Sequence, residues 1–291
     1  MRIGVDFGGT KIEAALMDAG GTLRARVRRL TPQSYEAAIA AIRDLVGEAE
    51  AAAGAKGISA GIAAPGSISP VNGLMRNANS TWLNGRALAQ DLEAALARPV
   101  RIANDANCFA LSEAVDGAAA DAHCVFGVIV GTGCGGGVVI DKRVHKGASG
   151  VAGEWGHTPL PWAQEDETPG PACWCGKQGC LETWISGSGF RRWSGMSAED
   201  ASRSDAAEAG AALDLLYDRL ARGLSVVINV LDPDAIVFGG GLSNLEGLYE
   251  GVARKLPGYV FSDVVRVRLL RNVHGDSSGV RGAAWLFDPM P

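Results

Sequence analysis

The sequence predicts an α/β protein, because short apolar strands alternate with amphipathic helices and three glycine-rich turns each follow a strand directly. The chain has 291 residues, of which 47% are apolar and 20% charged, so it is long enough for two domains with buried cores. The chain has 40 glycines, an excess over average usage, and clusters of them follow apolar runs in DFGGT, VGTGCGGG and FGGGLS. This placement indicates tight turns after strands and not a flexible linker.

The first predicted elements are consecutive strands joined by short turns, and a similar arrangement recurs later in the chain. These strands span residues 3–7, 12–17 and 23–30, and then 125–130, 137–140 and 144. Glycine-threonine turns stand at Thr10 and Thr132 in the two arrangements. Internal duplication of a phosphate-binding hairpin would explain the recurrence, and a chance likeness of two short motifs is the alternative.

Helices with clear boundary signals lie between and after these strands. Ser34 is a candidate N-cap for a helix over residues 35–53, which Gly54 ends. Apolar residues recurring every three or four positions predict a long core helix over 206–231, followed by a strand over 235–238. The other predicted helices span residues 86–97, 105–115 and 278–287.

The glycine-rich turns are candidate phosphate sites, because free backbone N–H groups after a strand form concave sites for phosphate oxygens. Neither a Walker motif nor a dinucleotide fingerprint accompanies them in the required setting. Three such turns in one chain favour a bound nucleotide. The candidate residues are Gly8, Gly9 and Thr10, then Gly131, Thr132 and Gly133, and finally Gly239, Gly240 and Gly241.

Charged residues flank the first glycine turn. Asp6 precedes it, and a carboxylate there would hold Mg²⁺ through water beside the phosphates. Lys11 follows it and would neutralise phosphate charge. A structural role for Asp6, capping free amides of the turn, is the alternative.

The segment IANDANC places Asn104 and Asp105 between a predicted strand and a predicted helix. Phosphoryl transfer needs a carboxylate that accepts the proton of the attacking hydroxyl, and Asp105 fits that role. Aspartate is also a common helix N-cap, and this segment alone favours that explanation. The other candidate site residues of the chain shift the preference to the catalytic role.

The segments GEWGHTPL and CWCGKQGCLET contain a candidate metal cluster. Cys173, Cys175 and Cys180, with His157 sixteen residues before the first cysteine, supply the four ligands of a closed tetrahedral Zn²⁺ site. Free thiols are the alternative, and a disulfide is disfavoured because no secretion signal is present. A closed site leaves no position for catalytic water, so the metal would hold the loop that carries Glu154 and Glu182.

Charge and hydropathy exclude some classes of protein. The net charge of −5 and the pI near 5.5 give no general attraction to nucleic acid. No run of apolar residues is long enough for a transmembrane helix, and the first residues do not form a signal peptide. We therefore expect a cytoplasmic protein with neither a nucleic-acid nor a membrane partner.

Together the motifs DxGGTK, ND, GTG, ExGH and CxCGxxGCxE resemble those of the ROK family of bacterial sugar kinases and sugar-responsive repressors. The resemblance covers essentially the whole chain. It implies an actin-like (ribonuclease H-like) ATPase fold, with two α/β domains around a central cleft that holds ATP on one side and sugar at its bottom. Because the phosphate turn begins at Asp6, we expect no DNA-binding domain ahead of the fold, and hence a kinase.

Carried over by motif, the resemblance implies that Asp105 is the catalytic base and that the glycine turns hold the nucleotide. Gly8 to Lys11 and Gly131 to Gly133 would contact phosphates, and Gly239 to Gly241 would lie near the adenosine. His157 would bind zinc through one ring nitrogen and sugar through the other. The residues implied at the sugar are Gly66, Asn79, Asn104, Asp105, Glu154, His157 and Glu182.

The resemblance also implies a domain arrangement and a substrate. The N-terminal domain is expected over residues 1–117, with the last helix, about 277–291, packing back on it, and the C-terminal domain over 118–276. The segments NANSTWLNG, AGEWGHTPLPW and HGDSSGVRGAAWL look most like bacterial fructokinases, which predicts ATP-dependent phosphorylation of D-fructose to fructose 6-phosphate. Glucokinase, N-acetylglucosamine kinase and a non-catalytic sugar-binding regulator are the alternatives, and a homodimer is expected.

Overall fold

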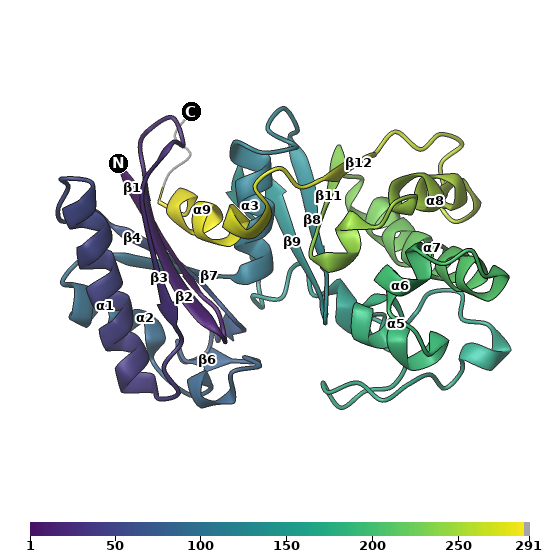
Figure 1. The fold of residues 1–291 in the computed structure, drawn as a ribbon, viewed down its shortest axis with the longest axis horizontal. Helices are drawn as coiled ribbons and strands as arrows, with labels where there is room; N and C mark the ends of the chain where they lie inside the picture. The colour runs from purple at the N-terminus through teal and green to yellow at the C-terminus, as the bar shows by residue number, and fades with distance from the viewer. Residues whose placement is uncertain (288–291) are drawn as a thin grey trace. The chain divides into compact units, whose positions relative to one another are not determined.

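The computed structural model describes residues 1–287, and the chain folds into two compact units (Figure 1). Of the described residues, the first unit contains Met1–Ala120, Gly137–Ala152 and 274–287, and the second contains Asp121–Gly136 and Gly153–Val273. The expected division placed residues 1–117 and the last helix in one domain and 118–276 in the other, whereas here residues 137–152 also belong to the first unit. Residues 137–152 join the first unit because their hairpin packs on the helix that begins at Asp105, and a Cβ at Gly137 would lie 2.6 Å from the Ala106 carbonyl oxygen.

The first unit is built on a five-stranded sheet of order β3-β2-β1-β4-β7. Strands β1, β2 and β3 are antiparallel neighbours, whereas β4 and β7 run parallel to β1. The strands are β1 (Arg2–Phe7), β2 (Lys11–Met17), β3 (Leu23–Leu30), β4 (Ala60–Ala64) and β7 (Val100–Asn104), with a separate small pair of β5 (Ser67–Ile68) and β6 (Met75–Arg76).

Helices cover both faces of this sheet (Figure 1). The alternating side chains of Ile3, Val5 and Phe7 face the core under α1 (Tyr35–Ala52) and α2 (Leu88–Leu96). Ser34 is the N-cap of α1 and accepts a hydrogen bond from the Ala37 N–H, as predicted. The helices α3 (Asp105–Val115) and α9 (Ser278–Trp285) pack on the other side. The last residues of the predicted final segment, 288–291, lie outside the described part of the chain.

The predicted helix over residues 86–97 is shorter than expected. The helix α2 begins at Leu88, because the backbone of Arg86 is already used: its carbonyl oxygen accepts from the Met75 N–H of β6, and its N–H donates to the Leu83 carbonyl. Pairing to a strand edge holds the backbone away from helical geometry at this position.

Glycines allow α9 to lie directly on the sheet and on α3. A Cβ at Gly61 of β4 would lie 1.7 Å from the Ala283 carbonyl oxygen, and one at Gly4 of β1 would lie 2.0 Å from the Val280 carbonyl oxygen. Within α9 itself, a Cβ at Gly282 would lie 1.7 Å from the Cys108 carbonyl oxygen of α3. These close contacts fix the C-terminal helix to the strands that carry the first glycine turn.

We expect Gly61→Ala to lower the free energy of unfolding by about 3 kcal/mol, since the methyl group must displace backbone atoms in a close-packed interior. Urea unfolding would measure the change. Gly47→Ala is the matched control, because Gly47 lies inside α1 with no heavy atom within 4 Å of the added Cβ. That variant should gain up to about 1 kcal/mol from helix propensity. Equal stability of the two variants would contradict the packing argument.

A second sheet has the same strand order, β10-β9-β8-β11-β12. Its strands β8, β11 and β12 belong to the second unit, whereas β10 and residues 137–140 of β9 belong to the first. As in the first sheet, three strands that follow one another in the chain, β8, β9 and β10, lie side by side. The two later strands, β11 and β12, run parallel to β8. This identity of order agrees with an internal duplication. The strands are β8 (Cys124–Val130), β9 (Cys134–Ile140), β10 (Arg143–Val144), β11 (Ala235–Gly239) and β12 (Arg268–Arg271).

One long helix dominates the second unit. It is α7 (Ala207–Leu231), which matches the predicted helix over 206–231 and buries its leucine stripe. The shorter helices are α4 (Glu182–Ile185), α5 (Gly187–Ser194), α6 (Ala198–Ser202) and α8 (Leu248–Lys255). Across residues 1–287, no helix has both the length and the apolar character required to span a bilayer.

Candidate active site

Two predicted acidic residues lie at the same edge of the first sheet. Asp6 pairs in register with Ala63, and Ala63 pairs with Ala103, directly before Asn104 and Asp105. Because β1, β4 and β7 are parallel, their carboxyl ends meet at one edge. Desolvation, and then repulsion by Asp105 and Glu13, raise the pKa of Asp6 to about 6 against the opposing effect of Lys11. A cation beside Asp6 would relieve this cost, which fits a role near Mg²⁺.

The helix N-cap at this edge is Asn104 and not Asp105. The Asn104 Oδ1 accepts a hydrogen bond from the Asn107 N–H at 2.7 Å, and α3 begins at the next residue. The Asp105 carboxylate accepts only from the adjacent Ala106 N–H among the hydrogen bonds found for residues 1–287, and it is accessible to solvent. Desolvation by the surrounding protein raises the pKa of Asp105, although backbone N–H groups oppose the shift. An accessible carboxylate whose pKa is raised suits a general base.

The first glycine turn closes the hairpin of β1 and β2. The Gly8 N–H donates to the Lys11 carbonyl, and the Thr31 hydroxyl donates to the Gly8 carbonyl at 2.6 Å. Gly9 and Thr10 are exposed at the tip of the turn. Hydrogen bonds therefore fix the base of the turn at Gly8, while its tip is accessible to a ligand, as a phosphate-binding turn requires.

Gly66 and Asn79, the remaining sugar candidates of the first unit, lie after β4 and β6. Gly66 has a φ of +79°, and a Cβ there would lie 2.5 Å from the Arg76 carbonyl oxygen, so only glycine fits. Asn79 is exposed, and its Oδ1 accepts from the Ser80 N–H. Both therefore lie on the segment that leaves the sheet at its carboxyl edge.

The second and third glycine turns lie side by side in the second unit. Gly239, at the end of β11, pairs with Ile129 of β8, so both strands end at the same edge. Gly240 has a φ of +81°, and a Cβ there would lie 2.5 Å from the Val130 carbonyl oxygen. Gly131 N–H donates to the Gly133 carbonyl and closes the second turn. The two predicted nucleotide turns thus meet.

A pocket of about 980 Å³ lies beside these turns, and its far wall was not predicted. Residues 191–205 are mostly polar and have no helical periodicity, yet they include the end of α5 and the whole of α6. The Gly187 N–H donates to the Gly131 carbonyl, and the Ser188 hydroxyl donates to the Thr132 carbonyl at 2.7 Å. The lining residues include Gly131, Thr132, Ser188, Arg191, Arg203, Gly241 and Leu242.

We expect Gly240→Ala to raise the KM for ATP about tenfold, because a strained left-handed backbone and the contact with Val130 together cost about 1–3 kcal/mol and move the turn. Steady-state kinetics with varied ATP would measure it. Gly210→Ala is the control, since Gly210 is exposed on α7 and its added Cβ meets no atom within 4 Å. A normal KM in Gly240→Ala would argue against a role for this turn in ATP binding.

The predicted acids of the second unit flank the same turns. The Glu182 carboxylate accepts from the Cys134 N–H and from the Trp174 indole N–H, each at 2.9 Å. A Cβ at Gly133 would lie 2.9 Å from Glu182 Oε2, so the glycine permits this approach. Glu154 is exposed at the start of the 3₁₀ turn Trp155–His157. The contacts of Glu182 with Cys134 and Trp174 were not predicted, since neither has a sequence signature.

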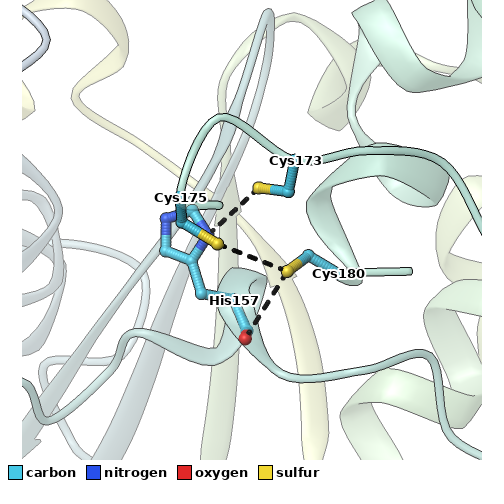
Figure 2. A group of neighbouring side chains, drawn as sticks. All are labelled: His157, Cys173, Cys175 and Cys180. Atoms are coloured by element: carbon cyan, nitrogen blue, oxygen red, sulfur yellow. Dashed lines mark hydrogen bonds between the residues drawn. The ribbon is translucent and has the colours of Figure 1, made fainter. Parts of the chain in front are cut away.

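The four predicted zinc ligands gather in one place (Figure 2). Their ligand atoms all lie within 4.8 Å of one another. The Cys175 and Cys180 sulfurs are 3.6 Å apart, and the Cys173 sulfur is 3.6 Å from His157 Nδ1. Two sulfurs bound tetrahedrally to zinc at about 2.3 Å would be about 3.8 Å apart. The donor set and the spacing therefore fit zinc.

The candidate residues fall into two sets, each brought together within one unit. Those of the first unit are Asp6, Gly8, Gly9, Thr10, Lys11, Gly66, Asn79, Asn104 and Asp105. Those of the second unit are Gly131, Thr132, Gly133, Glu154, His157, Cys173, Cys175, Cys180, Glu182, Gly239, Gly240 and Gly241.

Comparisons with known proteins identify the family. The family model described as the ROK family matches residues 2–289. An N-acetyl-D-glucosamine kinase of Pasteurella multocida is 39% identical over 99% of both chains. The crystal structure of a ROK hexokinase from Thermus thermophilus has a TM-score of 0.87 and 31% identity, covering 98% of this chain and 97% of its own. A ROK family glucokinase from Streptomyces griseus, solved with glucose and AMPPNP, has a TM-score of 0.79 and 27% identity over 98% of both chains.

Fold and site together define an ATP-dependent sugar kinase with the actin-like α/β fold of two related sheets. The chain belongs to the ROK family. This membership confirms the resemblance drawn from its motifs. The comparisons do not confirm the fructokinase subtype.

Proposed function

We propose that this sugar kinase transfers the terminal phosphoryl group of ATP to a hydroxyl of N-acetyl-D-glucosamine. The observation that carries the proposal is the 39% identity to an N-acetyl-D-glucosamine kinase over nearly the full length of both proteins. This substrate was one of the alternatives that the sequence left open, and it now replaces D-fructose as the first choice. Glucose is the second candidate, supported by the structural likeness to a hexokinase and a glucokinase.

The proposed reaction assigns a separate task to each group of residues. The oxygen of the sugar hydroxyl bonds to the terminal phosphorus of ATP, and Asp105 accepts the proton of that hydroxyl. The bond between this phosphorus and the bridging oxygen breaks, and ADP leaves with its electron pair. The glycine turns position the phosphates, and Asp6 would hold a Mg²⁺ ion that would supply positive charge beside them. The remaining side chains orient the sugar hydroxyls: Asn79, Asn104, Glu154, His157 and Glu182, with Gly66 giving space.

We further propose that the Cys173, Cys175, Cys180 and His157 cluster holds a structural Zn²⁺. The metal would cross-link the loop and would take no part in the reaction, because protein ligands fill all four of its coordination positions. His157 faces Cys173 with Nδ1, so its Nε2 is the ring nitrogen left to donate toward sugar. The homodimer and the cytoplasmic location remain predictions; light scattering after gel filtration would check the first.

A panel of sugars tests the proposed function. Purified protein is assayed for ADP release with ATP, Mg²⁺ and, in turn, N-acetyl-D-glucosamine, D-glucose, D-mannose and D-fructose. We expect the highest kcat/KM with N-acetyl-D-glucosamine. A tenfold preference for glucose or fructose would overturn the choice of sugar. Binding of a sugar without ADP release would instead support the regulatory alternative, and ADP release without sugar would indicate a plain ATPase.

A further inference from the structure

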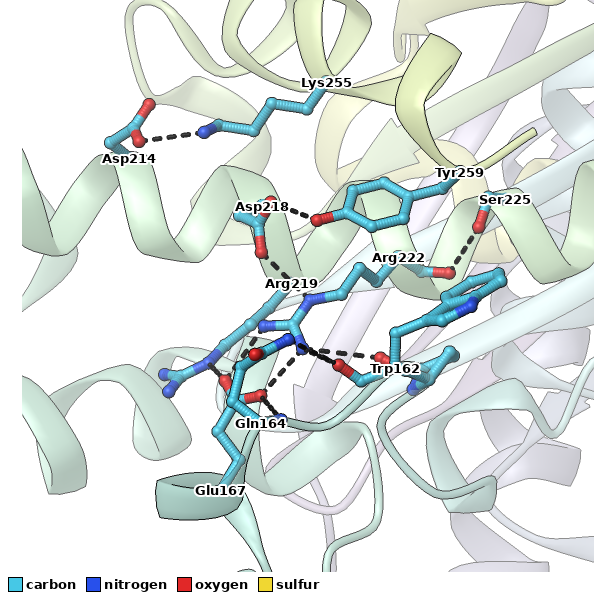
Figure 3. A network of polar contacts seen from close by, with 11 residues as sticks. Trp162, Gln164, Glu167, Asp214, Asp218, Arg219, Arg222, Ser225, Lys255 and Tyr259 are labelled. Atoms are coloured by element: carbon cyan, nitrogen blue, oxygen red, sulfur yellow. Dashed lines mark hydrogen bonds and ion pairs between the residues drawn. The ribbon is translucent and has the colours of Figure 1, made fainter.

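A buried ion cluster lies in the second unit, centred on Glu167 (Figure 3). Glu167 and Arg219 are each 5% exposed, and Arg222 is 1% exposed. The Glu167 carboxylate accepts from Arg219 Nε at 2.8 Å and from both terminal nitrogens of Arg222, at 2.7 and 2.9 Å. We call these three residues the Glu167 cluster. Charges this well buried are retained only where good geometry compensates their desolvation.

The Glu167 cluster ties α7 to the loop between two zinc ligands. Glu167 ends a 3₁₀ turn in the segment that connects His157 with Cys173. Its carboxylate also accepts from the Gln164 N–H at 2.9 Å, which holds the turn itself. Arg222 adds a bond to the Trp162 carbonyl at 3.0 Å. The arginines of α7 thereby bind the connecting segment at two points, the Glu167 side chain and the Trp162 backbone carbonyl.

Arg219 makes a second set of contacts that Arg222 does not make. Its guanidinium carbon lies 4.4 Å from the ring centroid of Trp184 and 4.4 Å from that of Trp193. The Trp193 indole N–H donates to the Trp184 backbone carbonyl at 2.9 Å, which joins the Trp193 ring to the backbone of α4. Arg222 instead pairs with Asp218 at 2.9 Å. Only Arg219 therefore links Glu167 to these tryptophans.

The two tryptophans belong to the helices that reach the candidate active site. Trp184 lies in α4, which begins at Glu182. Trp193 lies in α5, whose first residues, Gly187 and Ser188, bond to the second glycine turn. A guanidinium in contact with both rings thus ties α4 and α5 to Glu167.

We propose that Arg219 is a positioning residue for phosphoryl transfer, which holds Glu182 and the α5 wall of the nucleotide pocket through Trp184 and Trp193. It touches neither substrate. The inference rests on the kinase activity proposed above but not on which hexose is the substrate. Small displacements of positioning groups have large kinetic effects, because the reacting atoms must be aligned within a fraction of an ångström.

The test is Arg219→Met, which keeps an unbranched apolar side chain beside the rings but removes the guanidinium. Glu167 retains the Arg222 and Gln164 donors, so no buried charge is left alone. We expect the KM for ATP and the KM for sugar each to rise about tenfold, with a lower kcat. Arg219→Lys keeps a positive charge that can still reach Glu167, so its KM values and kcat should lie between those of the methionine variant and those of the unaltered protein. This variant replaces Arg219→Met in the test if the methionine variant does not fold.

Arg98→Met is the matched control, since Arg98 pairs with Glu50 in the first unit and contacts no candidate site residue. It should be destabilised without any change in KM. Isothermal calorimetry with a non-hydrolysable ATP analogue and with the sugar gives Kd values, which measure binding independently of turnover. Normal KM and Kd values in both Arg219 variants, at any loss of stability, would overturn the proposal. Activity of the unaltered protein on the sugar panel tests the proposed function separately.

Discussion

Asp105→Asn is expected to lower kcat by about 10²- to 10⁴-fold, the usual contribution of a general base, while the Kd for sugar changes only a few-fold. The amide keeps the size of the side chain and its hydrogen bond from the Ala106 N–H, but it cannot accept the hydroxyl proton. Stopped-flow or coupled ADP assays would measure kcat, and isothermal calorimetry would measure sugar binding.

The control is Asp44→Asn, the same replacement on the exposed face of α1, where only surface ion pairs are lost. Its kinetics should be unchanged, since exposed pairs contribute little. Near-normal turnover in Asp105→Asn would remove the proposed base. Loss of sugar binding as large as the loss of kcat would instead assign Asp105 to binding.

The proposed role of Asp105 predicts a pH dependence of defined sign. A general base must be ionised, and desolvation raises the pKa of Asp105 above its ordinary value of 3.8. Therefore kcat/KM should fall as the pH decreases through this raised pKa. Asp6, with a pKa of about 6, titrates in the same direction, so the profile is measured at saturating Mg²⁺, which favours its ionised form. An acid limb at the ordinary aspartate value would contradict a desolvated base.

The sequence predicted the turns and strands because their signals are local. Glycines after apolar runs indicate tight turns, and the cysteine spacing requires no knowledge of distant residues. Local signals could not predict that Asn104 is the N-cap of α3. Both Asn104 and Asp105 are good caps, and the choice depends on where the register of β7 with β4 ends.

Features that depend on distant pairing could not be predicted. The helices α5 and α6 contain eight and five residues, too few for a periodic pattern to emerge from a polar segment. Glu167 stands in the acidic run QEDE, which resembles a solvated loop, and its arginine partners lie more than fifty residues away. The choice of sugar likewise depends on a few hydrogen bonds whose geometry a sequence does not contain.

Cys175→Ser is expected to reduce bound zinc from about one per chain to none, because three ligands no longer close the tetrahedral site. Structural zinc contributes its binding energy to folding, so the thermal midpoint should fall by about 10 °C or more. Turnover should fall with it, because the released loop carries Trp174, the donor that holds Glu182. Elemental analysis, thermal unfolding and kinetics on the same preparation would measure the three effects.

Cys124→Ser provides the control, because it makes the same replacement at a cysteine that lies at the start of β8, outside the cluster. It should keep its zinc, and it should lose only the stability that a buried serine costs. Chelation of the unaltered protein should reproduce the Cys175→Ser phenotype, since both remove the same cross-link. If zinc is absent from the unaltered protein while its turnover is normal, the four side chains form no metal site and Glu182 must be held by Trp174 and Cys134 alone.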